Sequence, residues 1–178
     1  EGSTNWKDPS QIRLSWNPDD LSARDSDGHG THTATTAAGN YGVDAYINGE
    51  FQGKVSGIAH RARIAAYKVC WQADGNGGCA SSDSMAAIDQ AVADGVDVIN
   101  YSIGGPSTSF NSPADIAFLL AADAGVWVAT SQGNSGPGPE TTGTPAGVPW
   151  ITAVGASQDD QVFATGVEVA APTSIAGE

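Results

Sequence analysis

Three histidines are the residues of this sequence best suited to move protons or bind a metal, and two of them share one short string. His29 stands between two glycines, so neighbouring side chains leave its imidazole ring unshielded. His32 follows three residues later, within a run of small residues that ends at Gly39. An exposed imidazole can serve as a general base. A surface or hydrogen-bonded core position is the ordinary structural alternative for either ring.

A metal site is one alternative for His29 and His32, because residues three apart can share a helical face. Zinc sites on helices usually separate two histidines by four positions, with a glutamate between them and a third ligand elsewhere. No glutamate lies between these histidines, and the only other histidine is His60. The spacing and the lack of a glutamate between the two histidines therefore argue against a zinc site.

Two glycine-rich strings further along could bind a peptide and stabilise negative charge. The first runs from Asn100 to Pro106, and its paired glycines leave backbone groups uncovered for an extended peptide. The second is Thr130–Pro137, in which Asn134 follows a glycine just beyond an apolar run. Its side-chain amide could donate to an oxyanion from there. An ordinary strand-to-loop transition and a turn asparagine are the structural alternatives.

The segments between these strings alternate between strand and helix patterns. The sequence predicts strands over Arg63–Val69, Val96–Ile103, Val126–Thr130 and Trp150–Val154, a hairpin over 40–57 with Asn48-Gly49 at its turn, a buried helix over 29–38, and further helices over Ser82–Asp94 and Ser112–Ala124. This alternation indicates a parallel sheet with right-handed crossovers. Ligands bind beyond the carboxyl ends of such strands, where both glycine-rich strings lie.

The composition is typical of a folded, exported domain. Hydrophobic residues make up 40% of the 178 residues, charged residues only 15%, and 23 residues are glycine. The formal net charge of −13 repels phosphate backbones and anionic lipids, so we expect no nucleic-acid or membrane partner. No apolar run approaches the ~20 residues of a membrane span.

Cys70 and Cys79 flank a glycine-rich turn and are either two free thiols or a disulfide. The exported character favours a disulfide that closes this short loop. Asp74 and Asn76 in the turn could give oxygens to calcium, which needs about six to eight of them. A plain turn is the simpler interpretation of these two residues.

Taken in order, the strings resemble the subtilisin-like serine proteases (subtilases), and most closely the plant-type branch with an inserted protease-associated domain. The matching strings lie between about Ser22 and Asp160 and are Asp27-Gly28-His29-Gly30-Thr31-His32-Thr33-Ala34, Gly57-Ile58-Ala59, Ala65–Trp71, Asp94–Asn100, Ser102-Ile103-Gly104 and Gly133–Pro137. The resemblance implies a three-layer α/β fold, incomplete here, with a mainly parallel sheet and helices on both faces. It divides the chain into a partial catalytic domain, 1–160, whose residues 1–21 match nothing, and a segment 161–178 leading into the inserted domain.

The resemblance also implies a role for each string. His29 would be the general base, His32 would be structural, and Asn134 would donate to the oxyanion. The strand that binds the substrate backbone would be Ser102, Ile103 and Gly104, and the floor of the side-chain pocket would be Thr130, Ser131, Gln132 and Gly133. The implied protein is a secreted serine endopeptidase that cleaves extended polypeptides and requires no cofactor.

Two catalytic parts of that family have no match in the sequence. The family's aspartate lies in an Asp-Thr/Ser-Gly string on an earlier strand, and Asp25-Ser26-Asp27-Gly28 is too close to His29 to replace it. The nucleophile string is only imitated by Pro172-Thr173-Ser174-Ile175-Ala176, which has proline where glycine is needed. We therefore expect a fragment without the aspartate and serine, inactive alone. The alternatives are a non-catalytic, peptide-binding protease fold and a metal-dependent hydrolase built on His29 and His32.

Overall fold

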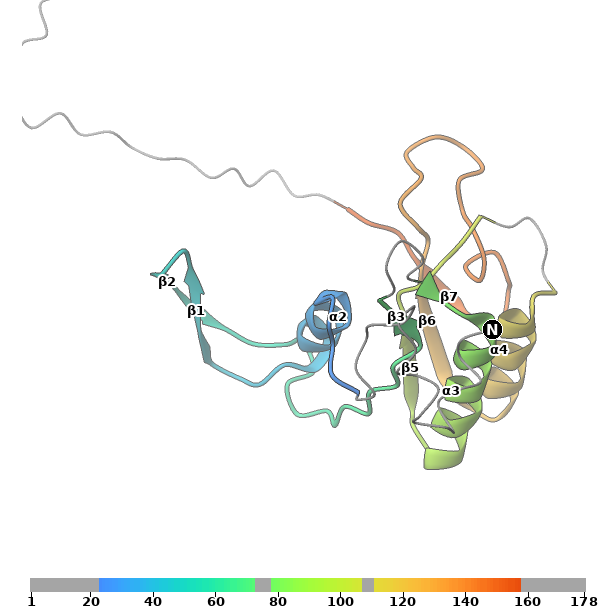
Figure 1. Ribbon diagram of the computed structural model, residues 1–178, viewed down its shortest axis with the longest axis horizontal. Helices are drawn as coiled ribbons and strands as arrows, with labels where there is room; N and C mark the ends of the chain where they lie inside the picture. Colours follow the sequence, from blue (N-terminus) through green and yellow to red (C-terminus); the bar gives the residue numbers. More distant parts are fainter. Residues whose placement is uncertain (1–22, 73–77, 107–110, 158–178) are drawn as a thin grey trace, which may run out of the picture.

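A three-stranded parallel sheet forms the centre of the protein in the computed structural model, which describes residues 23–72, 78–106 and 111–157 (Figure 1). The strands are β5 (Val98–Tyr101), β6 (Trp127–Ser131) and β7 (Thr152–Val154), in the spatial order β5-β6-β7. Tyr101 pairs with Thr130, which in turn pairs with Ala153. Parallel pairing brings the carboxyl ends of all three strands to one edge, as the sequence predicts. Each strand begins later than expected, and β5 ends at Tyr101, so Ser102 and Ile103 of the predicted strand Val96–Ile103 lie beyond it.

Helices α3 (Ser81–Asp94) and α4 (Pro113–Asp123) pack side by side on one face of this sheet (Figure 1). The chain leaves them through Gly95 and Gly125, whose φ angles of 75° and 88° are left-handed values that glycine adopts without strain. At the start of α4, the Ser112 hydroxyl accepts from the Asp115 amide, while the Asp115 carboxylate accepts from the Ser112 amide. This capping box fixes the first turn of α4.

The core lies between these two helices and the sheet. Phe118 of α4 is completely buried, and its ring meets the Tyr101 ring edge-on at 5.0 Å between centroids. The other buried members of the cluster are Ile88, Ala117, Ala121, Val126 and Val128. Burial of an aromatic ring against a strand residue fixes α4 relative to β5.

Helix α2 (His29–Ala38) lies on the opposite side of the sheet from α3 and α4 (Figure 1), so helices flank both faces as predicted. Its small residues allow the chain at 57–59 to approach closely: the Gly57 amide donates to Gly39 O at 3.0 Å. A Cβ on Gly57 would lie 2.1 Å from the Gly39 nitrogen. The prediction of a buried helix is wrong, because no residue of α2 is buried and the close contacts cover only its C-terminal end.

A β-hairpin follows α2 and extends away from the sheet (Figure 1). Strands β1 (Val43–Ile47) and β2 (Glu50–Val55) pair antiparallel around Asn48 and Gly49. Both turn residues have positive φ angles, 51° and 86°, as a type I′ turn requires. The Asn-Gly signal therefore predicts the hairpin and its turn correctly.

The predicted strand Arg63–Val69 is wrong. These residues belong to no strand, and a short antiparallel pair follows them instead, between β3 (Cys70–Trp71) and β4 (Gly78–Cys79). A strand exists only where a neighbour pairs with its backbone, and no described strand pairs with 63–69. Side chains hold the segment instead, since the Tyr67 hydroxyl donates to Asp94 at 2.6 Å.

The disulfide prediction is confirmed, because Cys70 and Cys79 are bonded across the β3–β4 pair with Cα atoms 4.0 Å apart. Asp74 and Asn76, the residues considered for calcium, lie outside the described residues, as does the 161–178 segment. None of the helices in the described ranges combines the length and the apolar character needed to cross a bilayer.

We expect Phe118→Ala to lower the free energy of unfolding by about 3–5 kcal/mol, because the cavity left under Tyr101 cannot fill completely. Leu120→Ala on the same helix is the matched control, since that side chain is 61% exposed and should change stability by only about 0.5 kcal/mol. Urea denaturation followed by fluorescence measures both. Equal destabilisation by the two substitutions would contradict this assignment of the core.

Candidate active site

The two predicted substrate-binding strings lie side by side at the carboxyl edge of the sheet. Tyr101, the last residue of β5, pairs with Thr130, so Ser102 leaves the sheet beside the end of β6, where Ser131 still pairs with Val154 of β7. The Thr130 hydroxyl reinforces this register by donating to Tyr101 O at 2.9 Å. The pairing therefore brings the start of the first string, at Ser102, to the end of β6, where the second string begins at Thr130. The substrate-binding roles of Ser102, Ile103 and Gly104 and of Thr130, Ser131, Gln132 and Gly133 stay predictions.

A tight turn carries the chain from β6 to Asn134. The Gln132 amide donates to Val154 O at 2.9 Å, and the Gly133 amide donates to the Ser131 hydroxyl at 2.9 Å. Gly133 has a φ of 94°, which a side chain would strain. Asn134 leaves this turn exposed to solvent at the edge of the sheet. From such a position its amide is free to meet a ligand placed on the strand ends.

A third segment, not identified from the sequence, also lies at this edge. Thr144 forms an isolated antiparallel bridge with Gly105, with N···O distances of 3.0 and 3.1 Å. The neighbouring Gly143 approaches so closely that a Cβ there would lie 2.3 Å from Gly105 O. The string Gly143-Thr144-Pro145 reads as an ordinary turn, so the sequence contains no signal for this contact.

Asp115 connects this third segment to α4. Its side chain is completely buried, with Oδ1 accepting from the Thr144 hydroxyl at 2.9 Å and Oδ2 from the Ser112 amide at 3.0 Å. The sequence predicts Ser112 as the N-cap of α4, but it does not predict the hydrogen bond between Asp115 and Thr144. Burial, followed by the negative charge of Asp115, raises the pKa of Tyr101, while a hydrogen bond with Ser84 lowers it.

His29 is the first residue of α2, and the loop before it is organised by a second carboxylate. Asp25 accepts four hydrogen bonds of 2.7–3.0 Å, from the amides of Asp27, Gly28 and Thr31 and from the Thr31 hydroxyl. These bonds, that of Gly28 above all, hold the pKa of Asp25 well below its usual range. Asp25 thus serves the helix start, a role that sequence reasoning missed although aspartate commonly precedes helices.

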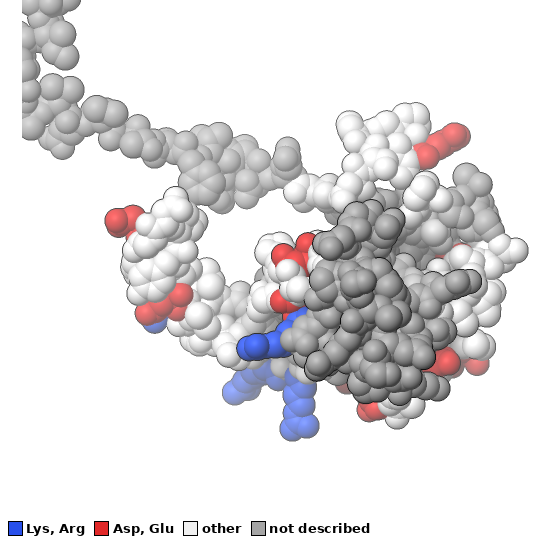
Figure 2. Space-filling view, in the orientation of Figure 1, with Lys and Arg blue, Asp and Glu red and all other residues white. Residues whose placement is uncertain are grey.

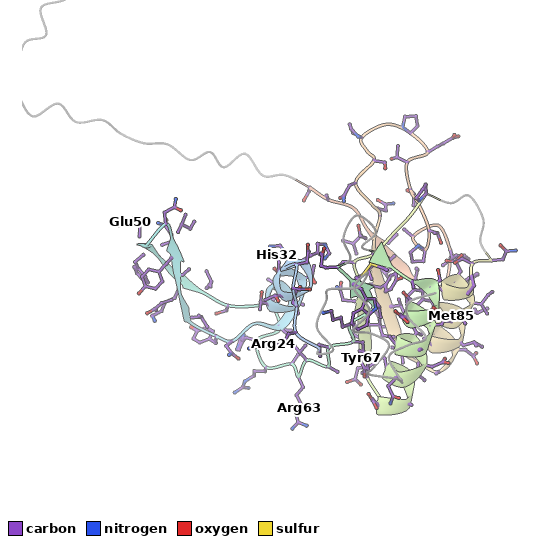
Figure 3. All side chains as sticks on the ribbon, viewed as in Figure 1. Arg24, His32, Glu50, Arg63, Tyr67 and Met85 are labelled. Atoms are coloured by element: carbon purple, nitrogen blue, oxygen red, sulfur yellow. A yellow bond between two sulfur atoms is a disulfide. The ribbon has the colours of Figure 1, made fainter. Side chains whose placement is uncertain are left out.

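The loop is also tied to the chain around β3. Lys68 Nζ donates to Arg24 O at 3.0 Å, and Gln72 donates to the Asp27 carboxylate at 3.3 Å. Most of the basic side chains on the face that Figure 2 shows gather below α2, where Figure 3 labels Arg24 and Arg63, while Lys54 lies apart on the β1–β2 hairpin. Acidic side chains are scattered elsewhere on that face. The loop that leads into α2 and His29 is therefore held both by hydrogen bonds within the loop and by hydrogen bonds to the chain around β3.

The structure does not bring every predicted residue into contact. Among the described residues, no hydrogen bond joins His29 to the strings at 102–104 or 130–134. Their arrangement across a cleft stays a prediction. His32 lies one turn further along α2 (Figure 3). No cluster of three or more metal-ligating side chains occurs within the ranges that the structure describes.

Known proteins are similar to this chain in sequence and in fold. The sequence matches the subtilase family, peptidase S8, over residues 3–174. Subtilisin-like protease SBT1.6 of Arabidopsis thaliana is 48% identical over 147 residues, which are 80% of this chain and 19% of that protein. Subtilisin-like protease SBT1.5 of the same organism is 47% identical over 157 residues, 88% of this chain and 20% of that protein. The chain thus spans about a fifth of the length of these relatives.

Two solved structures support the same fold. The S41 psychrophilic protease superposes with a TM-score of 0.56 at 36% identity, covering 74% of this chain and 39% of its own. Sphericase gives a TM-score of 0.55 at 32% identity, with coverages of 76% and 43%. The predicted α/β arrangement is therefore the one found in known subtilisin-like proteins.

We expect Asp25→Asn to destabilise the protein at neutral pH, because an amide cannot accept the four hydrogen bonds that the carboxylate accepts. The folded-state pKa of Asp25 is depressed, so its stabilisation is present above the unfolded value of about 4 and is lost as the pH falls below it. The difference in melting temperature between wild type and variant should therefore shrink in acid. Asp89→Asn, at an exposed position of α3, is the control. A difference that stays constant with pH would contradict this assignment.

Proposed function

This chain belongs to the subtilase family, and from that premise we propose that the protein is a serine-type endopeptidase that hydrolyses peptide bonds in extended polypeptides. The observation that carries the proposal is the parallel pairing of β5 with β6. It supports a site in which Ser102–Gly104, just after β5, would bind the substrate backbone, and Thr130–Gly133, at the end of β6, would form the side-chain pocket. Asn134 follows directly and would be the oxyanion donor.

His29 would act as the general base of this reaction. It takes the proton from a serine hydroxyl as the oxygen attacks the scissile carbonyl, and it returns that proton to the amine that leaves. The negative charge that develops on the carbonyl oxygen would be stabilised by the Asn134 side-chain amide. Water then hydrolyses the resulting acyl-enzyme, with His29 again transferring the proton.

The nucleophilic serine and the orienting aspartate would lie outside residues 1–178. The chain covers only about a fifth of its relatives, and its sequence holds neither an Asp-Thr/Ser-Gly nor a Gly-Thr-Ser string. Residues 1–160 would then be part of the catalytic domain, and 161–178 would lead into an inserted protease-associated domain. This segment by itself would show no turnover, because a base without its nucleophile forms no acyl-enzyme.

The protein would be secreted and would need no cofactor for catalysis. The Cys70–Cys79 disulfide supports secretion, because such bonds persist in oxidising compartments. The triad reaction uses side chains alone. A calcium ion at Asp74 and Asn76, if bound, would contribute to stability and not to the reaction.

We expect His29→Ala in the full-length protein to lower turnover by several orders of magnitude. Asn134→Ala should cost on the order of 10²–10³ in kcat, the range known for this donor in subtilisin itself, with little change in KM. His60→Ala is the matched control, since this exposed ring contacts Tyr41 and has no proposed catalytic role. Steady-state cleavage of a peptide substrate measures all three, and undiminished turnover in the His29 variant would overturn the mechanism.

Covalent labelling separates the proposal from its two alternatives. A serine-reactive phosphonate should label the full-length protein and abolish its turnover, while a chelator should leave turnover intact. A metal-dependent hydrolase built on His29 and His32 would give the opposite pair of results. A non-catalytic peptide-binding fold would bind peptide, show no turnover and resist the phosphonate.

A further inference from the structure

We propose that Asp115 is a positioning residue for substrate binding, acting through Thr144 to hold the Ser102–Gly104 segment in the shape that a peptide pairs with. This inference rests on the proposed function, because it concerns the same substrate-binding strand. In the part of the chain that the structure describes, no hydrogen bond joins Asp115 directly to residues 102–104 or to a residue with a proposed catalytic role. Its effect passes through one hydroxyl group and one pair of backbone hydrogen bonds.

Asp115 is a carboxylate in a fully buried position, which is unusual. Its side chain is 0% exposed, and the donors that reach its two oxygens, the Thr144 hydroxyl and the Ser112 amide, are both uncharged. Among the described residues, the ion pair joins Lys54 to Asp44 and does not include Asp115. A buried carboxylate costs free energy unless its hydrogen bonds are made. Capping α4 requires only one of its oxygens, so the second oxygen has a separate task.

That second oxygen fixes the position of Thr144. The Thr144 hydroxyl donates to Asp115 Oδ1, while the Thr144 backbone exchanges two hydrogen bonds with Gly105. The Trp150 indole donates to Asp115 O at 3.0 Å and secures the chain beyond Thr144 to the same turn of α4. Gly105 is therefore held against a segment that α4 holds in place.

The pairing of Gly105 determines which groups of the strand remain available. In an extended chain, the N–H and C=O groups of successive residues point to opposite sides. Because those of Gly105 point to Thr144, those of Gly104 would point away from it in an extended segment, toward an incoming peptide. The close approach of Gly143 to Gly105 O leaves little room for the strand to rotate. Loss of the Thr144 anchor would thus loosen the very groups that bind substrate.

Thr144→Val and Thr144→Ser form the decisive pair of variants in the full-length protein. Valine keeps the shape of threonine but removes the hydroxyl, whereas serine keeps the hydroxyl. We expect Thr144→Val to raise KM about five- to tenfold, the net effect of one lost hydrogen bond, with kcat within about twofold. Thr144→Ser should stay within about twofold of wild type in both constants. Asp123→Asn, on the exposed side of α4, is the control and should change neither.

The probe is fluorescein-labelled casein, followed by a fluorogenic peptide made from one of its cleavage sites. Amide hydrogen exchange at Gly105 and Thr144 gives a second measurement that does not depend on turnover. Exchange at both amides should accelerate in Thr144→Val and not in Thr144→Ser. A merely structural role would lower the melting temperature without raising KM, and that result would overturn the proposal.

The failure of this inference can be told apart from failure of the proposed function. Wild-type turnover with an unchanged KM in Thr144→Val would end the positioning role and leave the peptidase assignment intact. A wild type that binds the peptide without cleaving it would end the peptidase assignment. The dissociation constant would then replace KM in the same comparison, with the same expected ratios between the variants. A wild type that neither cleaves nor binds the peptide would overturn both proposals.

Discussion

The register between β5 and β6 is the constraint on which the candidate site depends. Two contacts of Tyr101 fix it: Phe118 packs against the Tyr101 ring, and the Thr130 hydroxyl donates to the Tyr101 carbonyl. A slip by one residue would turn Thr130 away from Tyr101 and reverse the face on which each side chain lies. It would also separate Ser102 from Ser131. The same few contacts therefore hold both the core under β5 and the candidate site residues that follow β5 and β6.

Buried polar groups add direction to this packing. Ser84 bonds with the Tyr101 hydroxyl at 2.9 Å, Asp83 accepts from the Trp71 indole at 2.8 Å, and Asp115 joins α4 to Thr144. Each bond connects elements that lie apart in the sequence, and no buried side-chain nitrogen or oxygen in the described ranges lacks a partner. Apolar contacts alone tolerate sliding, whereas these bonds are lost when an element moves. These hydrogen bonds therefore fix the relative positions of the elements more closely than hydrophobic burial alone would.

The sequence predicts those features whose causes are local. The caps at Ser112, Gly95 and Gly125 and the Asn48-Gly49 turn act within a few residues, so helices α3 and α4 and the hairpin follow from them. The segment 63–69 has an apolar strand pattern, but pairing needs a partner that composition cannot supply, and that prediction failed. The small residues of α2 indicate close approach without saying how much of the helix is covered. Contacts such as Asp115 with Thr144 arise only when distant segments meet.

The loop before His29 shows how local and distant causes combine at the candidate site. Asp25 shapes this loop from within, but its position relative to the sheet depends on β3, through the contact of Gln72 with Asp27. Strand β3 is joined by the Cys70–Cys79 disulfide to the residues that lead into α3, and Trp71 bonds to Asp83 in the first turn of that helix. Helix α3 packs against α4 and so belongs to the core beneath β5. The disulfide is thus more than a closed loop, because it lies on the path of contacts that relates the histidine helix to the sheet.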